Sequence, residues 1–219
     1  MTTTFLLEIG TEELPADFVR QALDQLRERV PHDLAEARLS HGSISIFGTP
    51  RRLVVSVPNL DDRQPDLREE RKGPPVPQAF KDGVPGPAAI GFAKRCGIDA
   101  SQLEQRDTPK GPCVFATVLT AGRDVVSLLS ELIPTWIDAL QGRRFMRWGT
   151  GTQRFSRPIR WLVALHGDDV IDVEMPGADP VVRSDRFSRG HRLHGNQQLC
   201  IASANQYVKT LQEAGVLVD

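Results

Sequence analysis

Residues 4–30, TFLLEIGTEELPADFVRQALDQLRERV, contain the first strand and the first helix that the sequence predicts. The apolar run from Thr4 to Ile9 is typical of a strand, and Gly10 ends it. From Pro15 to Val30 apolar residues recur at three- and four-residue intervals, which predicts an amphipathic helix with one face on a core. A strand followed directly by such a helix indicates a sheet with a helix packed against one of its faces.

The rest of the chain continues this mixture of strands and helices. Short strand-like runs at residues 43–47 and 53–57 follow the first helix. Further strands are predicted at residues 113–119, 159–165 and 170–173, and further helices at residues 88–95, 101–105, 125–140 and 205–214. The fold class predicted from this order is α+β, with mixed or antiparallel sheet layers, packed helices and two subdomains.

Changes in composition along the chain predict its domain organisation. Residues 1–60 form the strand-helix-strand-strand unit, and residues 61–87, which are charged and then rich in Pro and Gly, indicate a linker or long surface loop. Residues 88–105 are expected to form a small helical insert, and residues 106–219 a second α+β unit. Because a new apolar segment begins at Val216, we expect the chain to be part of a longer protein.

The overall composition limits the classes of protein. A hydrophobic content of 40%, a charged content of 25% and a net charge of -1 are typical of a globular chain, and not of one that coats nucleic acid indiscriminately. Three scattered cysteines, an odd number, favour a reducing compartment over a disulfide framework. The N-terminus does not resemble a signal peptide, and no apolar run approaches the ~18 residues of a membrane span. We therefore expect a cytoplasmic protein without a membrane partner.

Positive charge is concentrated in residues 140–161, LQGRRFMRWGTGTQRFSRPIRW, which we call the basic–aromatic segment. It holds six arginines and no acidic residue, with phenylalanines and tryptophans between the arginines. Guanidinium groups bind phosphate through paired hydrogen bonds, and aromatic rings stack on unpaired bases. Together with the turn at residues 48–50 and a second basic run further along, the segment predicts a set of RNA-binding residues. They are Arg51, Arg52, Arg143, Arg144, Arg147, Trp148, Arg154, Arg157, Arg160, Arg189 and Arg192.

Several blocks of the sequence resemble the β subunit of bacterial glycyl-tRNA synthetase. Residues 6–15, LLEIGTEELP, look like the opening signature of that family, and residues 47–53, FGTPRRL, are similar to a second block. The further blocks follow in the expected order and are Lys72-Gly73-Pro74, Gly91-Phe92-Ala93, Cys96-Gly97, Lys110-Gly111, Met146 to Gly149, Arg154 to Trp161 and Arg189 to Arg192. The departures are Ser156 in place of an apolar residue and Leu193 in place of an aromatic one. Family members continue into an HD-like domain and an anticodon-binding domain, so this chain corresponds to their N-terminal portion.

The resemblance implies an enzyme of two α and two β chains that attaches glycine to tRNA(Gly) in an ATP-dependent reaction. Its α chain would carry the catalytic site, with ATP and Mg²⁺, and its β chain would bind tRNA and hold the α chain in place. We therefore expect this chain to bind no cofactor and to supply no catalytic residue, and its sequence has no Walker-type phosphate loop. The implied partners are the α subunit and tRNA(Gly), with no DNA.

Three explanations of the arginines remain open at the level of sequence. They contact tRNA, they face the α subunit, or they pair with acidic residues of the same fold, for which the candidates are Glu8, Glu12, Glu13 and Asp17. Two rival functions also remain, a purely structural subunit-assembly module without tRNA contact and a free-standing RNA-binding protein. Salt dependence separates RNA binding from assembly, because phosphate contacts lose affinity steeply as salt rises.

Two further patterns are weaker. His191, His194 and Cys200 are an incomplete set of zinc ligands, and we predict no metal site from them. Gly149-Thr150-Gly151 is too short for a phosphate-binding loop, and we expect a flexible turn there.

Overall fold

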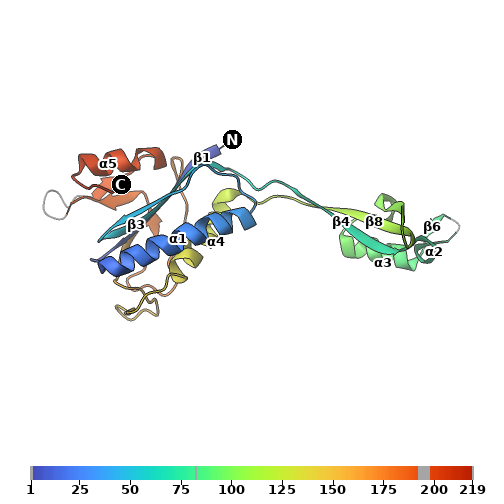
Figure 1. Ribbon diagram of the computed structural model, residues 1–219, viewed down its shortest axis with the longest axis horizontal. Helices are drawn as coiled ribbons and strands as arrows, with labels where there is room; N and C mark the ends of the chain where they lie inside the picture. The colour runs from blue at the N-terminus through green and yellow to red at the C-terminus, as the bar shows by residue number, and fades with distance from the viewer. Residues whose placement is uncertain (1, 82, 192–197, 219) are drawn as a thin grey trace. The chain divides into compact units, whose positions relative to one another are not determined.

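The computed structural model describes residues 2–81, 83–191 and 198–218. Within these ranges the chain forms two compact units (Figure 1). Unit 1 combines Met1–Gln64 with Arg123–Asp219, and unit 2 is Pro65–Gly122. Unit 2 is therefore an insertion between the two halves of unit 1.

Unit 1 is built on a 6-stranded sheet with β1 in its interior. The strand order is β10-β9-β1-β3-β2, and β11 pairs with β9 as well. The strands are β1 (Thr2–Thr11), β2 (Ser45–Thr49), β3 (Arg52–Asp61), β9 (Ile159–His166), β10 (Asp169–Val170) and β11 (Ser184–Asp185). All the pairs are antiparallel except that between β11 and β9. An antiparallel sheet with packed helices confirms the predicted α+β fold class.

Two helices cover one face of this sheet (Figure 1). The helix predicted from Pro15 to Val30 is present as α1 (Ala16–Glu36), but its predicted end is wrong, because the helix continues through Pro31. The helix predicted at residues 125–140 is confirmed as α4 (Val125–Asp138). Alternate residues of β1, from Phe5 to Ile9, contribute to the core between the sheet and these helices.

The C-terminal part of unit 1 covers the opposite face of the sheet. Its elements are β12 (Phe187–Arg189), β13 (Gln198–Cys200), the 3₁₀ turn η2 (Ala204–Gln206) and α5 (Tyr207–Glu213). Leu6 of β1 belongs to a second core there, together with Trp161 and Tyr207. Because both faces of the sheet are buried, β1 reads as a continuous apolar run instead of an alternating one.

Unit 2 has its own sheet and its own small core. The sheet order is β4-β8-β7, and all its pairs are antiparallel. The elements are β4 (Leu67–Pro75), α2 (Val76–Ala79), β5 (Phe80–Lys81), β6 (Val84–Pro85), α3 (Pro87–Cys96), η1 (Ala100–Gln102), β7 (Glu104–Thr108) and β8 (Gly111–Thr120). Phe92 of α3 packs with Val114 and Ala116 of β8, so the helix covers one face of the three strands (Figure 1).

The structure corrects the predicted domain boundaries. Residues 61–87 are not a linker, because β4 lies within them and pairs along its length with β8. Residues 88–105 and the first part of 106–219 belong to the same unit as β4, and the chain returns to unit 1 at Arg123. The helix expected at residues 101–105 is only the turn η1, after which β7 begins.

No helix within the described ranges is both long and apolar enough to cross a membrane.

Candidate nucleic-acid interface

The aromatic residues of the basic–aromatic segment belong to the core of unit 1. Phe155 is fully buried and packs edge-on against Phe18 of α1, with ring centroids 5.4 Å apart. Phe145 packs on the same ring at 5.7 Å. Trp148 is half-buried against this core, so its ring is not a freely exposed platform for a base. The aromatic residues therefore anchor the segment to the fold.

Backbone hydrogen bonds fix the path of the segment after α4. Met146 and Phe155 form an isolated antiparallel bridge, with N–O distances of 2.8 and 3.2 Å. Thr152 N donates to the carbonyl oxygen of Gly177 at 2.8 Å. The side chain of Gln153 donates to Asp138 of α4 at 2.8 Å. These bonds tie a surface hairpin to two distant parts of unit 1.

The turn at Gly149 to Gly151 is held by Asp179. The backbone N–H and the hydroxyl of Thr150 both donate to Asp179 Oδ2, at 2.6 and 2.7 Å. These bonds, the backbone one first, hold the pKa of Asp179 below its ordinary value. A Cβ on Gly149 would lie 2.5 Å from the Asp179 carbonyl oxygen, and one on Gly151 2.3 Å from that of Gly177. The expected turn is confirmed, and the close approach of these backbones requires glycine at both positions.

Four of the predicted arginines are exposed on this anchored hairpin. Within the residues that the structure describes, none of them has a carboxylate within ion-pair distance, and they are Arg143, Arg144, Arg147 and Arg154. Arg147 follows Met146 and Arg154 precedes Phe155, so both lie next to the Met146–Phe155 bridge on the two arms of the hairpin. Several exposed guanidinium groups on one short hairpin give the fold no electrostatic benefit of their own.

Two other predicted arginines pair with carboxylates of unit 1. Arg160 Nε lies 2.8 Å from Glu12 Oε1, at the surface. Arg52 is 2% exposed and is directed at Glu8 of β1, with 3.4 Å between its Nη1 and Oε1 of the carboxylate. The turn at residues 48–50 was expected to present Arg51 and Arg52 to RNA, and this expectation is wrong for Arg52, because its guanidinium is buried.

The Glu8 carboxylate is the centre of a buried polar network. It accepts hydrogen bonds from Trp161 Nε1 at 2.6 Å and from the hydroxyl of Ser188 at 2.7 Å. Arg52 also donates to the carbonyl oxygen of Arg189 at 2.8 Å. Burial, and then the negative charge of Glu8, raise the pKa of Tyr207 well above its ordinary value. The network joins β1, β3, β9 and β12.

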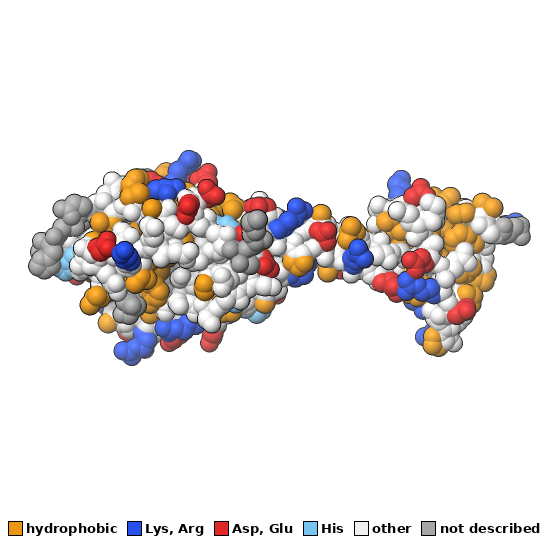
Figure 2. Space-filling model, turned by 90° about the horizontal axis from the view of Figure 1, so that it is seen from above, with side chains coloured by type: hydrophobic (Ala, Val, Ile, Leu, Met, Phe, Trp, Pro, Cys, Tyr) orange, Lys and Arg blue, Asp and Glu red, His pale blue; other side chains and the backbone are white. Residues whose placement is uncertain are grey.

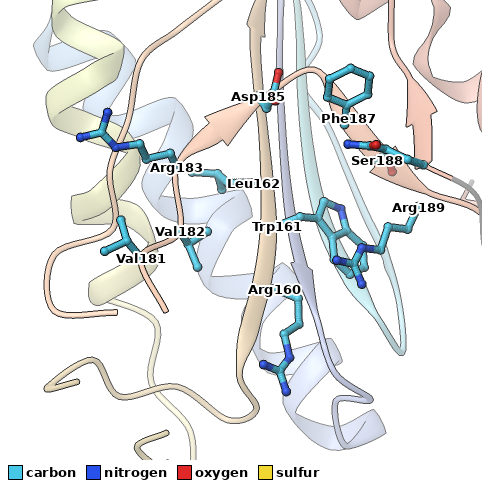
Figure 3. A pocket seen from close by; sticks show the side chains of 11 residues that line it. Arg160, Trp161, Leu162, Val181, Val182, Arg183, Asp185, Phe187, Ser188 and Arg189 are labelled. Atoms are coloured by element: carbon cyan, nitrogen blue, oxygen red, sulfur yellow. The ribbon is translucent and has the colours of Figure 1, made fainter. Parts of the chain in front are cut away.

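Two more of the predicted arginines, Arg51 and Arg189, lie near the ring of Trp161. A pocket of about 560 Å³ opens beside this ring, and Figure 3 shows the Arg189 side chain next to it. The guanidinium carbon of Arg189 is 5.1 Å from the ring centroid, and that of Arg51 is 5.8 Å away. Arg157 is half-buried and donates to the carbonyl oxygen of Ser156 at 2.7 Å.

Arg192 lies outside the described residues, as do Leu193 and His194. The sequence did not single out Asp138, Asp179 and Ser188 as residues that support the site. Each is tied to a residue that lies between 15 and 180 positions away in the chain, so no local pattern could have indicated them.

The face of unit 1 that Figure 2 shows carries no broad basic patch. Basic and acidic side chains are interspersed there, and neither sign forms a continuous area. A nucleic-acid contact on this face would therefore have to rely on a few arginines in fixed positions and not on a diffuse positive field.

Three side chains of α1 that could ligate a metal ion lie close together. His32, Asp33 and Glu36 of α1 have ligand atoms within 4.8 Å of one another. His32 and Glu36 are exposed, and Asp33 accepts a hydrogen bond from Trp136 Nε1 at 2.9 Å. Asp33 therefore has a structural role that needs no metal.

Comparison with known proteins identifies the family. The sequence matches the family model described as glycyl-tRNA synthetase beta subunit over residues 5–219. It is 48% identical over 216 residues to the glycine–tRNA ligase beta subunit of Acaryochloris marina. The aligned region covers 99% of this chain and 30% of that protein. The chain is 47% identical over 219 residues to the Trichodesmium erythraeum protein of the same name, covering 100% of this chain and 30% of the relative.

A more distant relative gives the same result. The Desulforudis audaxviator glycine–tRNA ligase beta subunit is 42% identical over 220 residues, which is 100% of this chain and 31% of that protein. The chain thus spans about 30% of the length of these relatives. Since the matches extend over nearly every described strand and helix, and not only over the short blocks, the chain belongs to the glycyl-tRNA synthetase β-subunit family.

Proposed function

We propose that the chain is the N-terminal part of a glycyl-tRNA synthetase β subunit that binds tRNA(Gly) through the exposed arginines of its hairpin. In this proposal the α subunit carries the catalytic site, with ATP and Mg²⁺, and attaches glycine to the tRNA that the β subunit holds. The chain supplies no catalytic residue. Its own task is to place positive charge where the phosphates of the folded RNA lie.

The exposure of Arg147 and Arg154 on either side of the Met146–Phe155 bridge is the observation that carries this proposal. Among the described residues neither guanidinium has a carboxylate within ion-pair distance, and an external phosphate would supply a partner of opposite charge. The hairpin is fixed beforehand by Thr150 and the buried Phe155, so little side-chain and loop entropy is lost on binding. Both features favour a phosphate partner over a role inside the fold.

The proposal assigns different roles to the other predicted residues. Arg143 and Arg144 extend the same exposed positive charge, and Arg51 and Arg189 lie beside the pocket at Trp161. Arg52 and Arg160 stabilise the fold through their acidic partners. The α subunit is the proposed protein partner. Met146 is proposed as part of the surface that contacts it, because its side chain is apolar and 42% exposed.

Reconstituted aminoacylation tests the proposal. In a mixture of α subunit with full-length β subunit carrying Arg147→Ala and Arg154→Ala, the KM for tRNA(Gly) is expected to rise by at least about a hundredfold, because two charge-assisted contacts that each contribute ~1.5–3 kcal/mol are lost. Glycine-dependent ATP–pyrophosphate exchange, which does not need tRNA, is expected to stay unchanged. The matched control is Arg20→Ala with Lys209→Ala, which removes the same charge from two exposed positions elsewhere in unit 1.

The rival function, a module that only assembles the subunits, gives the opposite pattern. Under that function the double arginine variant keeps the KM for tRNA, and any loss of activity follows a loss of α subunit from the complex. Analytical ultracentrifugation of the same mixtures reads that loss directly.

A further inference from the structure

A second polar site lies in unit 1 at the C-terminal end of β9. It is a pocket of about 660 Å³ beside His166. Four aspartates line it, and they are Asp62, Asp124, Asp168 and Asp169. Among the described residues that line the pocket there is no Lys or Arg. A concave surface with this much negative charge attracts cations.

His166 is buried against this acidic surface. Its side chain is 9% exposed, and its Nε2 has no hydrogen-bond partner in the described part of the chain. Burial lowers the pKa of His166, although the charges of Asp62, Asp124 and Asp169 act in the opposite direction. With the proton on Nδ1, the Nε2 of a neutral imidazole offers a lone pair to a ligand.

The spacing of His166 and Asp62 fits two ligands of one cation. The distance from His166 Nε2 to Asp62 Oδ1 is 3.6 Å. This is too long for a hydrogen bond. Two donor atoms that each lie ~2.0–2.2 Å from a tetrahedral cation are separated by a little over 3 Å, close to the spacing in the structure.

A third carboxylate lies next to this pair. Asp169 of β10 is the direct cross-strand partner of His166 on β9, so the two side chains project from the same side of the sheet. Asp169 is exposed, and a change of its rotamer costs little. Asp124 accepts hydrogen bonds from Val126 N at 2.9 Å and Ser127 N at 3.3 Å as the cap of α4, and it adds negative charge nearby.

We infer that His166 and Asp62, with Asp169 as third ligand, form a binding site for a divalent transition-metal cation such as Zn²⁺. One imidazole and two carboxylates are a ligand set that zinc accepts, with water in the fourth position. The cation joins the end of β9 to β10 and to the segment that follows β3, and binding to the folded state alone stabilises unit 1.

Isothermal titration of the untagged, chelator-treated chain with Zn²⁺ tests this site. One Zn²⁺ per chain is expected, and His166→Gln and Asp62→Asn are each expected to weaken its affinity at least tenfold. His32→Gln is the matched control, because it removes an imidazole from the exposed group on α1 and is expected to leave the affinity unchanged. The thermal midpoint of the wild-type chain rises with Zn²⁺, and that of the two site variants does not.

Three results overturn the inference. They are no Zn²⁺ binding by the wild-type chain, an unchanged affinity in both site variants, and loss of the Zn²⁺ in His32→Gln. Asp62→Asn keeps the test decisive if His166→Gln fails to fold, since Asp62 is partly exposed and the substitution keeps its shape. Paramagnetic broadening by Mn²⁺ of the amide signals around residues 166–169 locates the site independently.

Discussion

At the scale of single residues, the buried polar network around Glu8 explains why an acidic residue and a glycine occur in the apolar strand β1. Glu8 interrupts an apolar run, and it is fully buried because Arg52, Trp161 and Ser188 satisfy its carboxylate. Gly10 follows because a Cβ there would lie 1.9 Å from Cε2 of Trp161. The acidic residue and the glycine are thus a consequence of packing the tryptophan ring flat against β1.

Glu8→Gln tests the importance of this network. The substitution leaves the Arg52 guanidinium buried without a negative partner, which typically costs about 3–5 kcal/mol. The free energy of unfolding in urea is expected to fall by that amount. Glu28→Gln, on the exposed side of α1, is the control and is expected to have little effect.

The double variant Glu8→Gln with Arg52→Met separates lost pairing from lost packing. It removes the unpaired charge as well, so it is expected to recover part of the stability. An unfolding midpoint of Glu8→Gln equal to that of the wild type would contradict the importance of the buried pair.

At the scale of the elements, the sequence predicts the strands and helices that bury a periodic face. The helix α1 was predictable because its apolar residues recur at the helical period of 3.6 residues. The strand β1 was predictable because its apolar residues form a continuous run. The strand β4 was not, since Arg68 to Lys72 are all charged and exposed on an edge strand of a sheet with one open face. The strand β4 is held in place by its backbone hydrogen bonds to β8, and backbone pairing leaves no pattern of side chains in the sequence.

The hairpin of the candidate site was only half predictable for a related reason. Its arginines and its glycine-rich turn are visible in the sequence, and so is the tendency of arginine to bind phosphate. What holds the turn is not visible, because Asp179 lies 29 residues from Thr150. Whether each arginine is free or paired depends on such distant contacts, as Arg160 and Glu12, 148 residues apart, also demonstrate.

The Thr150–Asp179 contact predicts a measurable pH dependence. Hydrogen bonds from Thr150 lower the pKa of Asp179 in the folded chain below its ordinary value of 3.8. The contact therefore contributes stability above that ordinary pKa, and the contribution is lost as pH falls through the lowered pKa of the folded state. In Thr150→Val the pKa of Asp179, measured by carbon-detected NMR titration, is expected to rise.

The rise is expected to be partial, because the backbone N–H of residue 150 remains and is the larger cause of the shift. Thr152→Val, which keeps the backbone bond of residue 152 to Gly177, is the neighbouring control. No change in the Asp179 pKa in Thr150→Val would show that the hydroxyl does not contribute to holding the turn.

At the scale of the whole molecule, unit 2 is an insertion whose two connections to unit 1 lie side by side. Gln64 N donates to the carbonyl oxygen of Arg123 at 2.9 Å, and Arg123 N donates to the Gln64 side chain at 3.1 Å. The core of unit 2, with Phe92 and Val114, is made only of its own residues. The two units therefore have separate sources of stability.

Removal of unit 2 tests this independence. A chain in which two glycines replace residues 66–121 is expected to fold, because its ends are already in contact and a short loop costs little entropy to close. Thermal unfolding followed by circular dichroism should stay cooperative. The NMR shifts of β1 and β9 should match those of the full chain, and a molten spectrum would show that unit 1 depends on unit 2.

The most direct test of tRNA binding by the hairpin is the salt dependence of tRNA(Gly) affinity for the chain and for Arg147→Ala with Arg154→Ala. Each phosphate contact removed lowers the slope of log affinity against log salt by about 1. The wild-type slope is therefore expected to exceed that of the arginine double variant by about 2. The control variant, Arg20→Ala with Lys209→Ala, is expected to keep the wild-type slope. Equal slopes for the wild type and the arginine double variant would contradict the claim that this hairpin holds the RNA.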